Sequence, residues 1–254
     1  MTLPRTPSFR LDGRRALVTG GTSGIGLGCA VALAEQGAEV TVAARSADRV
    51  AKTVEALRGE GWQAAALPLD VADVAATGAA VAEAGPFDVL VNSAGVAKHS
   101  PALDTDPDDF DMVQGVNVKG AYFLARAVAQ GLIDAGRPGS IITVSSQMAH
   151  VGGIDRAVYC ATKHAVEGFT KSMAIEWAPH GIRVNTICPT FIRTPLVAQT
   201  LDRPDRRAWV EEKIKLGRVG EVEDIMGAVQ WLASDAAALV TGSAILIDGG
   251  WTAD

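Results

Sequence analysis

The feature that most constrains the fold is an alternation of short apolar segments with segments of helical periodicity, which runs from residue 15 to residue 247. The apolar segments are rich in β-branched residues and carry no regular polar alternation, as in EVTVAA at 39–44. Strands that are apolar on both faces belong in a parallel sheet that helices cover on both sides. Because crossovers between parallel strands are right-handed, the sequence predicts an α/β fold with one doubly wound parallel sheet of about seven strands, a Rossmann fold.

The same periodicities give the expected bounds of the elements. The expected strands span 15–19, 39–44, 64–69, 87–92, 140–145, 183–187 and 244–247. The expected helices span 25–35, 47–58, 74–83, 108–135, 158–178 and 222–233. A TIM barrel shows a similar alternation, but the glycine-rich first turn and the long helix before the fifth strand favour the open sheet. One irregular stretch, residues 189–205, is long enough to indicate a functional loop.

Composition narrows the class of protein. The 254 residues include 23 lysines and arginines against 29 aspartates and glutamates, which gives a net charge of −6 with histidine neutral. Without a basic stripe we expect no nucleic-acid partner, and without an apolar run of ~18 residues we expect no membrane partner. The N-terminus has no apolar stretch of the kind found in signal peptides. We expect one domain over residues 1–254, with residues 1–12 as an N-terminal extension.

The cysteines indicate the compartment. Cys29, Cys160 and Cys188 are odd in number, far apart and without C-x-x-C spacing. This pattern predicts reduced thiols in a cytoplasmic protein, with neither a disulfide framework nor a metal site.

A glycine cluster lies at the first junction between strand and helix. Residues 19–26 read TGGTSGIG, which gives G-x-x-x-G-x-G spacing. Glycines at such a junction let the backbone approach a pyrophosphate closely, while the helix N-terminus offers free N–H groups to the phosphates. A plain turn would also explain the glycines, but their position favours a dinucleotide site. The expected contacts are Gly20, Thr22, Ser23, Gly24, Ile25 and Gly26.

The end of the second strand predicts which dinucleotide binds. An acidic residue there would bind the ribose 2′-hydroxyl of NAD, whereas an arginine accommodates the 2′-phosphate of NADP. The strand ends in Ala44 and is followed by Arg45, without a carboxylate. The sequence therefore favours NADP(H), with NAD(H) and a solvated Arg45 as the alternative. Asp70 ends the third strand, where it could reach the adenine or cap a helix that begins near Ala72.

Three side chains indicate proton transfer at the same edge of the sheet. Tyr159 and Lys163 are spaced i,i+4 near the start of a helix, so both lie on one face of it. A lysine ammonium close to a phenol favours the phenolate form, and the tyrosine could then exchange a proton with a substrate oxygen. Ser146 ends the fifth strand, where ligands bind in open α/β sheets, and its hydroxyl could hydrogen-bond the same oxygen.

In this order and spacing, the motifs resemble the short-chain dehydrogenases/reductases over essentially the whole chain. The matching segments are TGGTSGIG (19–26), NSAG (92–95), NVKG (117–120), Ser146, YCATK (159–163) and PTFIRT (189–194). The resemblance implies a nicotinamide-dependent oxidoreductase that interconverts a secondary alcohol and a ketone by hydride transfer. By this resemblance, Tyr159 would be the general acid/base and Ser146 would orient the substrate oxygen. Lys163 would bind the nicotinamide ribose, and Asn117 would support a water relay to Lys163.

The resemblance also extends the set of expected cofactor contacts. Asn92 and Gly95 would follow the adenine and its ribose, whereas Ile192 and Thr194 would position the carboxamide. The remaining contacts expected are Val71, Ala94, Tyr159, Lys163 and Pro189. Two positions depart from the family pattern: Ser93 stands where asparagine is usual, and Thr190 stands where glycine is usual. The second departure bears on the backbone next to the nicotinamide.

The substrate should lie under residues 190–217, which resemble the lid of this family. The lid contains Arg193, Arg203, Arg206 and Arg207, which could clamp a carboxylate or phosphate or form a solvated helix face. The residues expected at the substrate are His99, Gln147, Met148, Asp155, Phe191 and Leu196. Several hydrogen-bonding groups among them favour a small polyol, sugar or sugar acid.

Other functions stay open at this point. A 3-oxoacyl thioester reductase and an NAD-dependent alcohol dehydrogenase differ little in these motifs. A cofactor-binding scaffold without turnover is disfavoured, because a scaffold needs no proton-transfer tyrosine. Family members usually form homotetramers through their two long helices and the C-terminal strand, so the resemblance implies a homotetramer, with a homodimer as the alternative.

Overall fold

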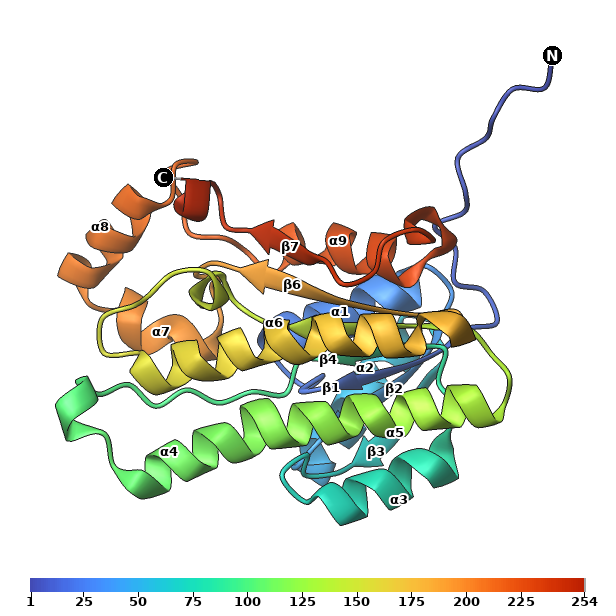
Figure 1. Ribbon diagram of the computed structural model, residues 1–254, viewed down its shortest axis with the longest axis horizontal. Helices are drawn as coiled ribbons and strands as arrows, with labels where there is room; N and C mark the ends of the chain where they lie inside the picture. Colours follow the sequence, from blue (N-terminus) through green and yellow to red (C-terminus); the bar gives the residue numbers. More distant parts are fainter. Residues whose placement is uncertain (254) are drawn as a thin grey trace.

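A seven-stranded parallel sheet forms the centre of the molecule (Figure 1). The computed structural model describes residues 1–253, apart from the side chain of residue 199. The strands are β1 (Arg15–Thr19), β2 (Glu39–Ala44), β3 (Ala64–Pro68), β4 (Val89–Asn92), β5 (Gly139–Val144), β6 (Ile182–Pro189) and β7 (Ala244–Ile247). Their order is β3-β2-β1-β4-β5-β6-β7, and every neighbouring pair is parallel. This is the doubly wound sheet that the sequence predicts, with its order reversing between β1 and β4.

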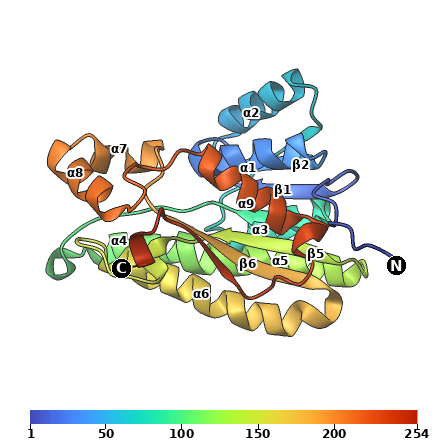
Figure 2. The same ribbon diagram turned by 90° about the horizontal axis from the view of Figure 1, so that it is seen from above.

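Helices cover both faces of the sheet (Figure 2). One face carries α1 (Gly24–Glu35), α2 (Ala47–Gly59) and α9 (Glu223–Ala233). The other face carries α3 (Val74–Ala84), α5 (Ala121–Asp134) and α6 (Ala157–Trp177). Both views show α7 (Pro195–Leu201) and α8 (Pro204–Lys213) beyond the carboxyl ends of the strands, and α4 (Pro107–Gln114) extends the line of α5 toward the same edge.

Alternate residues of the central strands pack into two separate cores. In β1, Val18 packs into the core under α1, α2 and α9, whereas its neighbour Leu17 packs under α3, α5 and α6. In β5, Ile142 and Ile141 divide in the same way, and all four side chains are fully buried. Because successive side chains of a strand point to opposite faces, a doubly covered strand needs an apolar residue at every position.

A third, smaller core positions the segment that follows β6. Phe191 and Met148 pack with Val210 of α8, and Trp251 near the C-terminus stacks on Phe191 with ring centres 5.6 Å apart. Trp209 of α8 meets the same indole edge-on at 5.3 Å. These contacts join α8 and the C-terminal segment to the carboxyl edge of the sheet.

The long helix expected over 108–135 is divided by a change in hydrogen bonding. α4 ends at Gln114, a π-helical turn spans Gly115–Gly120, and α5 follows directly from Ala121. A π-turn takes backbone groups out of the regular ladder, and such turns are frequent at functional sites. The apolar periodicity that predicted the helix does not distinguish between the two patterns.

The structure corrects the expectation of an irregular stretch over residues 189–205, because most of this stretch is helical. Residues 195–201 form α7, and α8 begins at residue 204 within the same stretch. Pro195 and Pro204 each occupy the first turn of a helix, where the missing N–H is not needed and the fixed φ suits the helix. The two prolines therefore start helices here rather than interrupt them.

The N-terminal residues stand apart from the sheet. Residues 1–10 are exposed and form neither helix nor strand, and Figure 1 shows them leading away from the body. Leu11, which is 1% exposed, is the first residue of the core. Within the described residues, no helix has the length and apolar character needed to span a bilayer.

Candidate functional site

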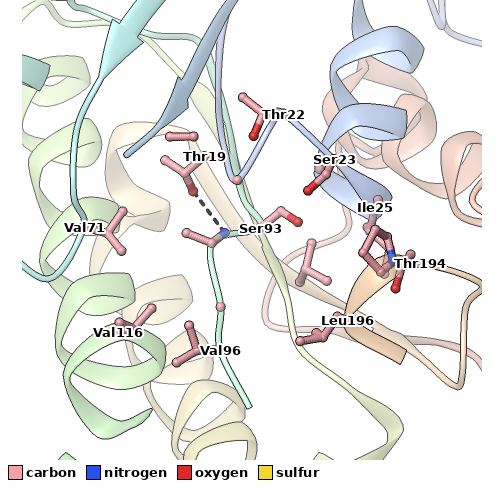
Figure 3. Close-up of a pocket in the computed structure, with 18 of the residues that line it drawn as sticks. Thr19, Thr22, Ser23, Ile25, Val71, Ser93, Val96, Val116, Thr194 and Leu196 are labelled. Atoms are coloured by element: carbon pink, nitrogen blue, oxygen red, sulfur yellow. Dashed lines mark hydrogen bonds between the residues drawn. The ribbon is translucent and has the colours of Figure 1, made fainter. Parts of the chain in front are cut away.

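A cavity of about 510 Å³ opens at the carboxyl ends of the strands, where the strand order reverses. Open α/β sheets bind ligands at this point, because the segments after the two central strands leave toward opposite faces. The cavity is lined from the loops after β1, β2, β3, β4, β5 and β6 and from α6. Figure 3 shows Ser23 and Ile25 on one side of it and Val71 and Val116 on the other.

The turn after β1 presents free donors to this cavity. Gly20 has a φ of +65°, and a Cβ there would lie 2.8 Å from the carbonyl oxygen of Ser93, so only glycine fits. The N-cap of α1, Ser23, makes no side-chain cap, and the first turn of α1 holds no acidic residue. The first N–H groups of α1 and the Ser23 hydroxyl are therefore free to bind an anion. This donor set fits the pyrophosphate of a dinucleotide.

Two arginines line the cavity beyond β2. Arg45 follows the strand and Arg49 lies one turn later in α2, and both are exposed. Sequence reasoning named Arg45 and missed Arg49, although the place of Arg49 in the first turn of the helix after β2 is a signal that could have found it. Asp70 also lines the cavity, and its carboxylate accepts a hydrogen bond from the Ala72 N–H at 3.0 Å. The N-cap of α3 is Asp73, so the helix-cap alternative for Asp70 is wrong.

Ser146, Tyr159 and Lys163 line the same cavity. Lys163 is 6% exposed; its Nζ donates to the Val144 carbonyl oxygen at 2.8 Å and lies 5.5 Å from the centre of the Tyr159 ring. Ser146 Oγ accepts from the Met148 N–H at 3.1 Å, which leaves the Ser146 hydroxyl proton free to donate. Among the described residues, the Tyr159 hydroxyl has no hydrogen-bond partner. The structure thus gathers the three residues that the sequence expected to act together.

Asn92 and Asn117 are expected site residues that do not line the cavity. Asn92 Oδ1 accepts from the Thr19 hydroxyl at 3.1 Å, and its Nδ2 donates to the Ala121 carbonyl oxygen at 3.3 Å. Asn117 binds the backbone of Val96 in both directions, with its Oδ1 accepting from the N–H and its Nδ2 donating to the carbonyl, each at 2.9 Å. Both side chains therefore hold the loop after β4 in place from behind the cavity wall.

The other expected cofactor residues all line this cavity of about 510 Å³, which we call the large cavity. They are Gly20, Thr22, Ser23, Gly24, Ile25, Gly26, Arg45, Asp70, Val71, Ala94, Gly95, Tyr159, Lys163, Pro189, Ile192 and Thr194. They come from the segments at the carboxyl ends of five strands and from α6, which only the fold brings together.

A second cavity, of about 60 Å³, lies against the first. Both cavities are lined by Ser146, Tyr159, Thr190, Leu196 and Val197. Of the residues expected at the substrate, His99, Gln147, Met148, Phe191 and Leu196 line the small cavity. Asp155 does not line it; its carboxylate lies 3.6 Å from the Arg206 guanidinium.

The small cavity holds a cation that sequence reasoning missed. Arg156 donates from Nη1 to Nε2 of His99 at 2.6 Å. Burial first, and then the Arg156 charge, lower the pKa of His99 to about 4, so the imidazole is neutral near pH 7 and Nε2 can accept. The place of Arg156, three residues before Tyr159 at the start of α6, is a signal that could have found it.

The arginines of the lid have carboxylate partners of their own. The pairs are Arg193–Glu221 at 2.9 Å, Arg203–Asp205 at 3.1 Å, Arg206–Asp155 at 3.6 Å and Arg207–Glu211 at 2.9 Å. In none of the four does the guanidinium line either cavity. This favours the solvated helix face over the clamp for all four.

One group of metal-ligating residue types lies outside both cavities. The ligand atoms of His150, Glu167 and Cys188 lie within 4.8 Å of one another. The two Glu167 oxygens already accept hydrogen bonds, from the Thr186 hydroxyl at 2.9 Å and from the Cys188 thiol at 3.3 Å. Burial and the neighbouring carboxylate raise the pKa of Cys188 to about 12, which keeps the thiol protonated. Because a thiol binds metal as the thiolate, we interpret the group as a hydrogen-bond network.

The chain is similar to known proteins along nearly its whole length. Residues 20–252 match the family model described as enoyl-(acyl carrier protein) reductase. The chain is 41% identical over 245 residues to D-erythrulose reductase of Gallus gallus, covering 96% of this chain and 98% of the relative. It is 40% identical over 248 residues to D-threitol dehydrogenase of Mycolicibacterium smegmatis, covering 96% and 95%. Its structure matches a gluconate 5-dehydrogenase from Burkholderia cenocepacia in complex with NADP and tartrate, with a TM-score of 0.94 and 38% identity over 97% of this chain and 98% of that one.

Proposed function

Because the chain belongs to the short-chain dehydrogenase/reductase family, we propose that it is an NADP(H)-dependent oxidoreductase that interconverts a secondary alcohol and a ketone on a small polyol, sugar or sugar acid. One observation carries the proposal: Ser146 and Tyr159 line both cavities. The large cavity has the donors for a dinucleotide, and the small one has polar groups for a substrate. A reacting oxygen at their junction would meet both hydroxyls.

The cofactor would lie in the large cavity. The N–H groups of the first turn of α1, with Thr22 and Ser23, would bind the pyrophosphate, because no side chain of the protein caps them. Arg45 and Arg49 would bind a 2′-phosphate beyond β2. Ile192 and Thr194 also line the cavity, and they would hold the nicotinamide carboxamide.

The chemistry of this chain's own residues is proton transfer and charge stabilisation. When bound, the nicotinamide supplies or accepts the hydride. Tyr159 would donate a proton to the substrate oxygen in reduction and remove it in oxidation. Ser146 would donate a hydrogen bond to the same oxygen, which strengthens as charge develops there. The buried Lys163 ammonium, 5.5 Å from the Tyr159 ring centre, would stabilise negative charge on the phenol oxygen.

The small cavity supports a compact, hydrophilic substrate. His99, Gln147 and Arg156 contribute polar groups to a volume of only about 60 Å³, which suits a few carbons with hydroxyl groups better than an acyl chain. The D-erythrulose reductase, D-threitol dehydrogenase and gluconate 5-dehydrogenase relatives carry names of this substrate class. We therefore rank a 3-oxoacyl thioester reductase below a polyol or sugar-acid enzyme.

The test replaces Tyr159 by phenylalanine. Phenylalanine keeps the ring that contacts Lys163 and His99 and removes only the hydroxyl. We expect normal folding and NADPH binding, with turnover of D-threitol, D-gluconate or D-erythrulose reduced roughly 100- to 10,000-fold, as followed by NADPH absorbance. The matched control is Tyr122→Phe, on α5 and 41% exposed, which should keep full activity. Substantial turnover by Tyr159→Phe would refute the assignment, and a wild-type enzyme inert toward the whole panel would favour the scaffold.

Three further expectations belong to this proposal. Residues 190–217 would act as a lid, since Leu196 and Val197 line both cavities. The chain would form a homotetramer through its long helices and β7; Ile175 on α6 is 76% exposed and Leu246 on the edge strand β7 is 44% exposed. It would work in the cytoplasm, where Cys29, Cys160 and Cys188 would stay reduced, as the free thiols of the structure are.

A further inference from the structure

The small cavity contains a positive charge that makes no direct ion pair with a carboxylate among the described residues. Arg156 lines this cavity together with Ser146 and Tyr159. Among the described residues, no carboxylate lies within 4.0 Å of its guanidinium nitrogens, although each of the four lid arginines has such a partner. The nearest acidic neighbour along the chain, Asp155, is paired with Arg206. A half-buried guanidinium still loses part of its hydration, which is costly unless a partner compensates for it.

The groups that hold Arg156 in place are all neutral. Its Nη1 donates to His99, its Nη2 donates to the Thr200 hydroxyl at 3.4 Å, and its guanidinium lies 5.3 Å from the centre of the Phe191 ring. A pKa of about 4 keeps His99 uncharged, so the imidazole orients the guanidinium without cancelling its charge. Burial lowers the pKa of Arg156 from its usual value, but a guanidinium stays protonated in a protein. The orientation is set before any ligand enters.

Two more side chains in the same place lack partners. Gln147 is 1% exposed, and neither its amide nitrogen nor its amide oxygen has a hydrogen-bond partner among the described residues. The buried Thr190 hydroxyl also lacks one. Both residues line the small cavity. An amide with a free donor and a free acceptor matches a hydroxyl group, which offers both.

Resting on the proposed function, we infer that the substrate is a polyhydroxy acid, whose carboxylate binds Arg156 and whose hydroxyl groups bind Gln147 and Thr190 while the reacting carbon lies at Ser146 and Tyr159. A planar guanidinium is suited to binding a carboxylate through two parallel hydrogen bonds. A neutral polyol would fill the same volume but would leave the charge uncompensated. Arg156 is thus a specificity-determining residue that selects sugar acids over sugar alcohols.

The test compares acids with the alcohols that differ from them at one carbon. The pairs are D-gluconate with D-glucitol, D-galactonate with galactitol, and D-threonate with D-threitol. In each pair a carboxylate replaces a hydroxymethyl group. We expect kcat/KM with NADP+ to favour at least one acid over its alcohol, and Arg156→Gln to reduce that kcat/KM about 10- to 150-fold, mainly through KM. Turnover of the alcohols should fall much less than turnover of the acid, because an alcohol has no carboxylate contact to lose.

Two variants control for loss of fold and for general charge effects. Arg156→Lys keeps the charge but loses the two-pronged geometry, and it should recover part of the affinity for the acid. Arg207→Gln removes a lid arginine that is paired with Glu211 and lines neither cavity, so it should leave both substrates unaffected. A wild-type enzyme that oxidises the alcohols and rejects every acid would overturn the inference while leaving the proposed function standing. So would an Arg156→Gln variant that slows both members of a pair equally.

A direct binding measurement tests the carboxylate site at Arg156 separately from the proposed oxidoreductase function. Each acid is titrated calorimetrically into enzyme loaded with NADPH, a form that cannot oxidise an alcohol. Binding to the wild type and its loss in Arg156→Gln would support the acid site even if no turnover is found, in which case only the proposed function fails. Equal binding to both proteins, or no binding of any acid to the wild type, would overturn the inference.

Discussion

The arginine pair beyond β2 gives the sharpest prediction about the cofactor. Arg45, just after β2, and Arg49, in the first turn of α2, both line the large cavity, and no glutamate or aspartate follows β2 directly. Replacing either arginine by glutamine removes a donor to the 2′-phosphate of NADPH and leaves the rest of the cavity intact. NADH has no phosphate at that position. The two dinucleotides should therefore respond differently to the same substitution.

The size of the effect follows from the exposure of the two side chains. A charge-assisted hydrogen bond contributes about 1.5–3 kcal/mol, and the lower end applies because both arginines are exposed. That value corresponds to about a tenfold rise in the Kd of NADPH for each single variant. The double variant should fall short of about 100-fold, because two donors to one phosphate are not independent. The affinity for NADH should stay as it is in the wild type.

The assay is a fluorescence titration of each dinucleotide at constant ionic strength. Lys52→Gln is the matched control, since it removes a positive charge from an exposed position of α2 that does not line the cavity. Screening by salt makes its effect on NADPH small. If Arg45→Gln and Arg49→Gln weaken NADPH and NADH alike, the arginines do not contact a 2′-phosphate. If the wild type prefers NADH, the enzyme is the NAD-dependent alternative.

Two further predictions concern the glycine turn and the small cavity. Gly26→Ala should lower stability by about 1–3 kcal/mol, because the new Cβ would lie 2.3 Å from the Gly20 carbonyl oxygen. Differential scanning calorimetry should then show a Tm lower by about 3–10 °C, and a titration should show weaker NADPH binding. The control is Gly78→Ala, whose new Cβ would have no atom within 4 Å and which should not lower the Tm. The pKa of His99 is about 4 in the folded protein against 6.5 ordinarily, so the unfolded chain takes up the proton first and stability falls as pH drops from 6.5 toward 4. His99→Asn should make the free energy of unfolding in urea fall less steeply over that window, and equal slopes would contradict the shift.

The sequence determines the sheet more firmly than it determines the site. β2 has the predicted bounds, because a run of small and β-branched apolar residues that is covered on both faces has no other favourable place. The i,i+4 spacing of Tyr159 and Lys163 likewise leads directly to a shared helix face. Arg156 could not be found in this way. The direction of the Arg156 side chain depends on Asp155, the residue before it, which leads the chain into α6 with a φ of +59°. Aspartate tolerates this backbone conformation but does not require it. Which arginine lacks a carboxylate depends in part on the pair of Arg206 with Asp155, which lie 51 residues apart in the chain.

Several unsatisfied polar groups lie at the two cavities. α2, α3 and α4 each begin with a side chain that caps the helix, from Ser46, Asp73 and Asp106. α1 begins with Ser23, a good capping residue, yet its hydroxyl makes no cap. A missing cap costs about 0.5–2 kcal/mol, and each unpaired buried polar group, such as the Gln147 amide, costs about 1–3 kcal/mol. A cofactor that supplies phosphate oxygens at α1 and a substrate that supplies hydroxyl groups at Gln147 would recover these losses. The enzyme with both ligands bound should therefore be more stable than the enzyme with either ligand alone. At Ser23 and Gln147, where the protein forgoes its own hydrogen bonds beside the two cavities, we expect cofactor and substrate to make them.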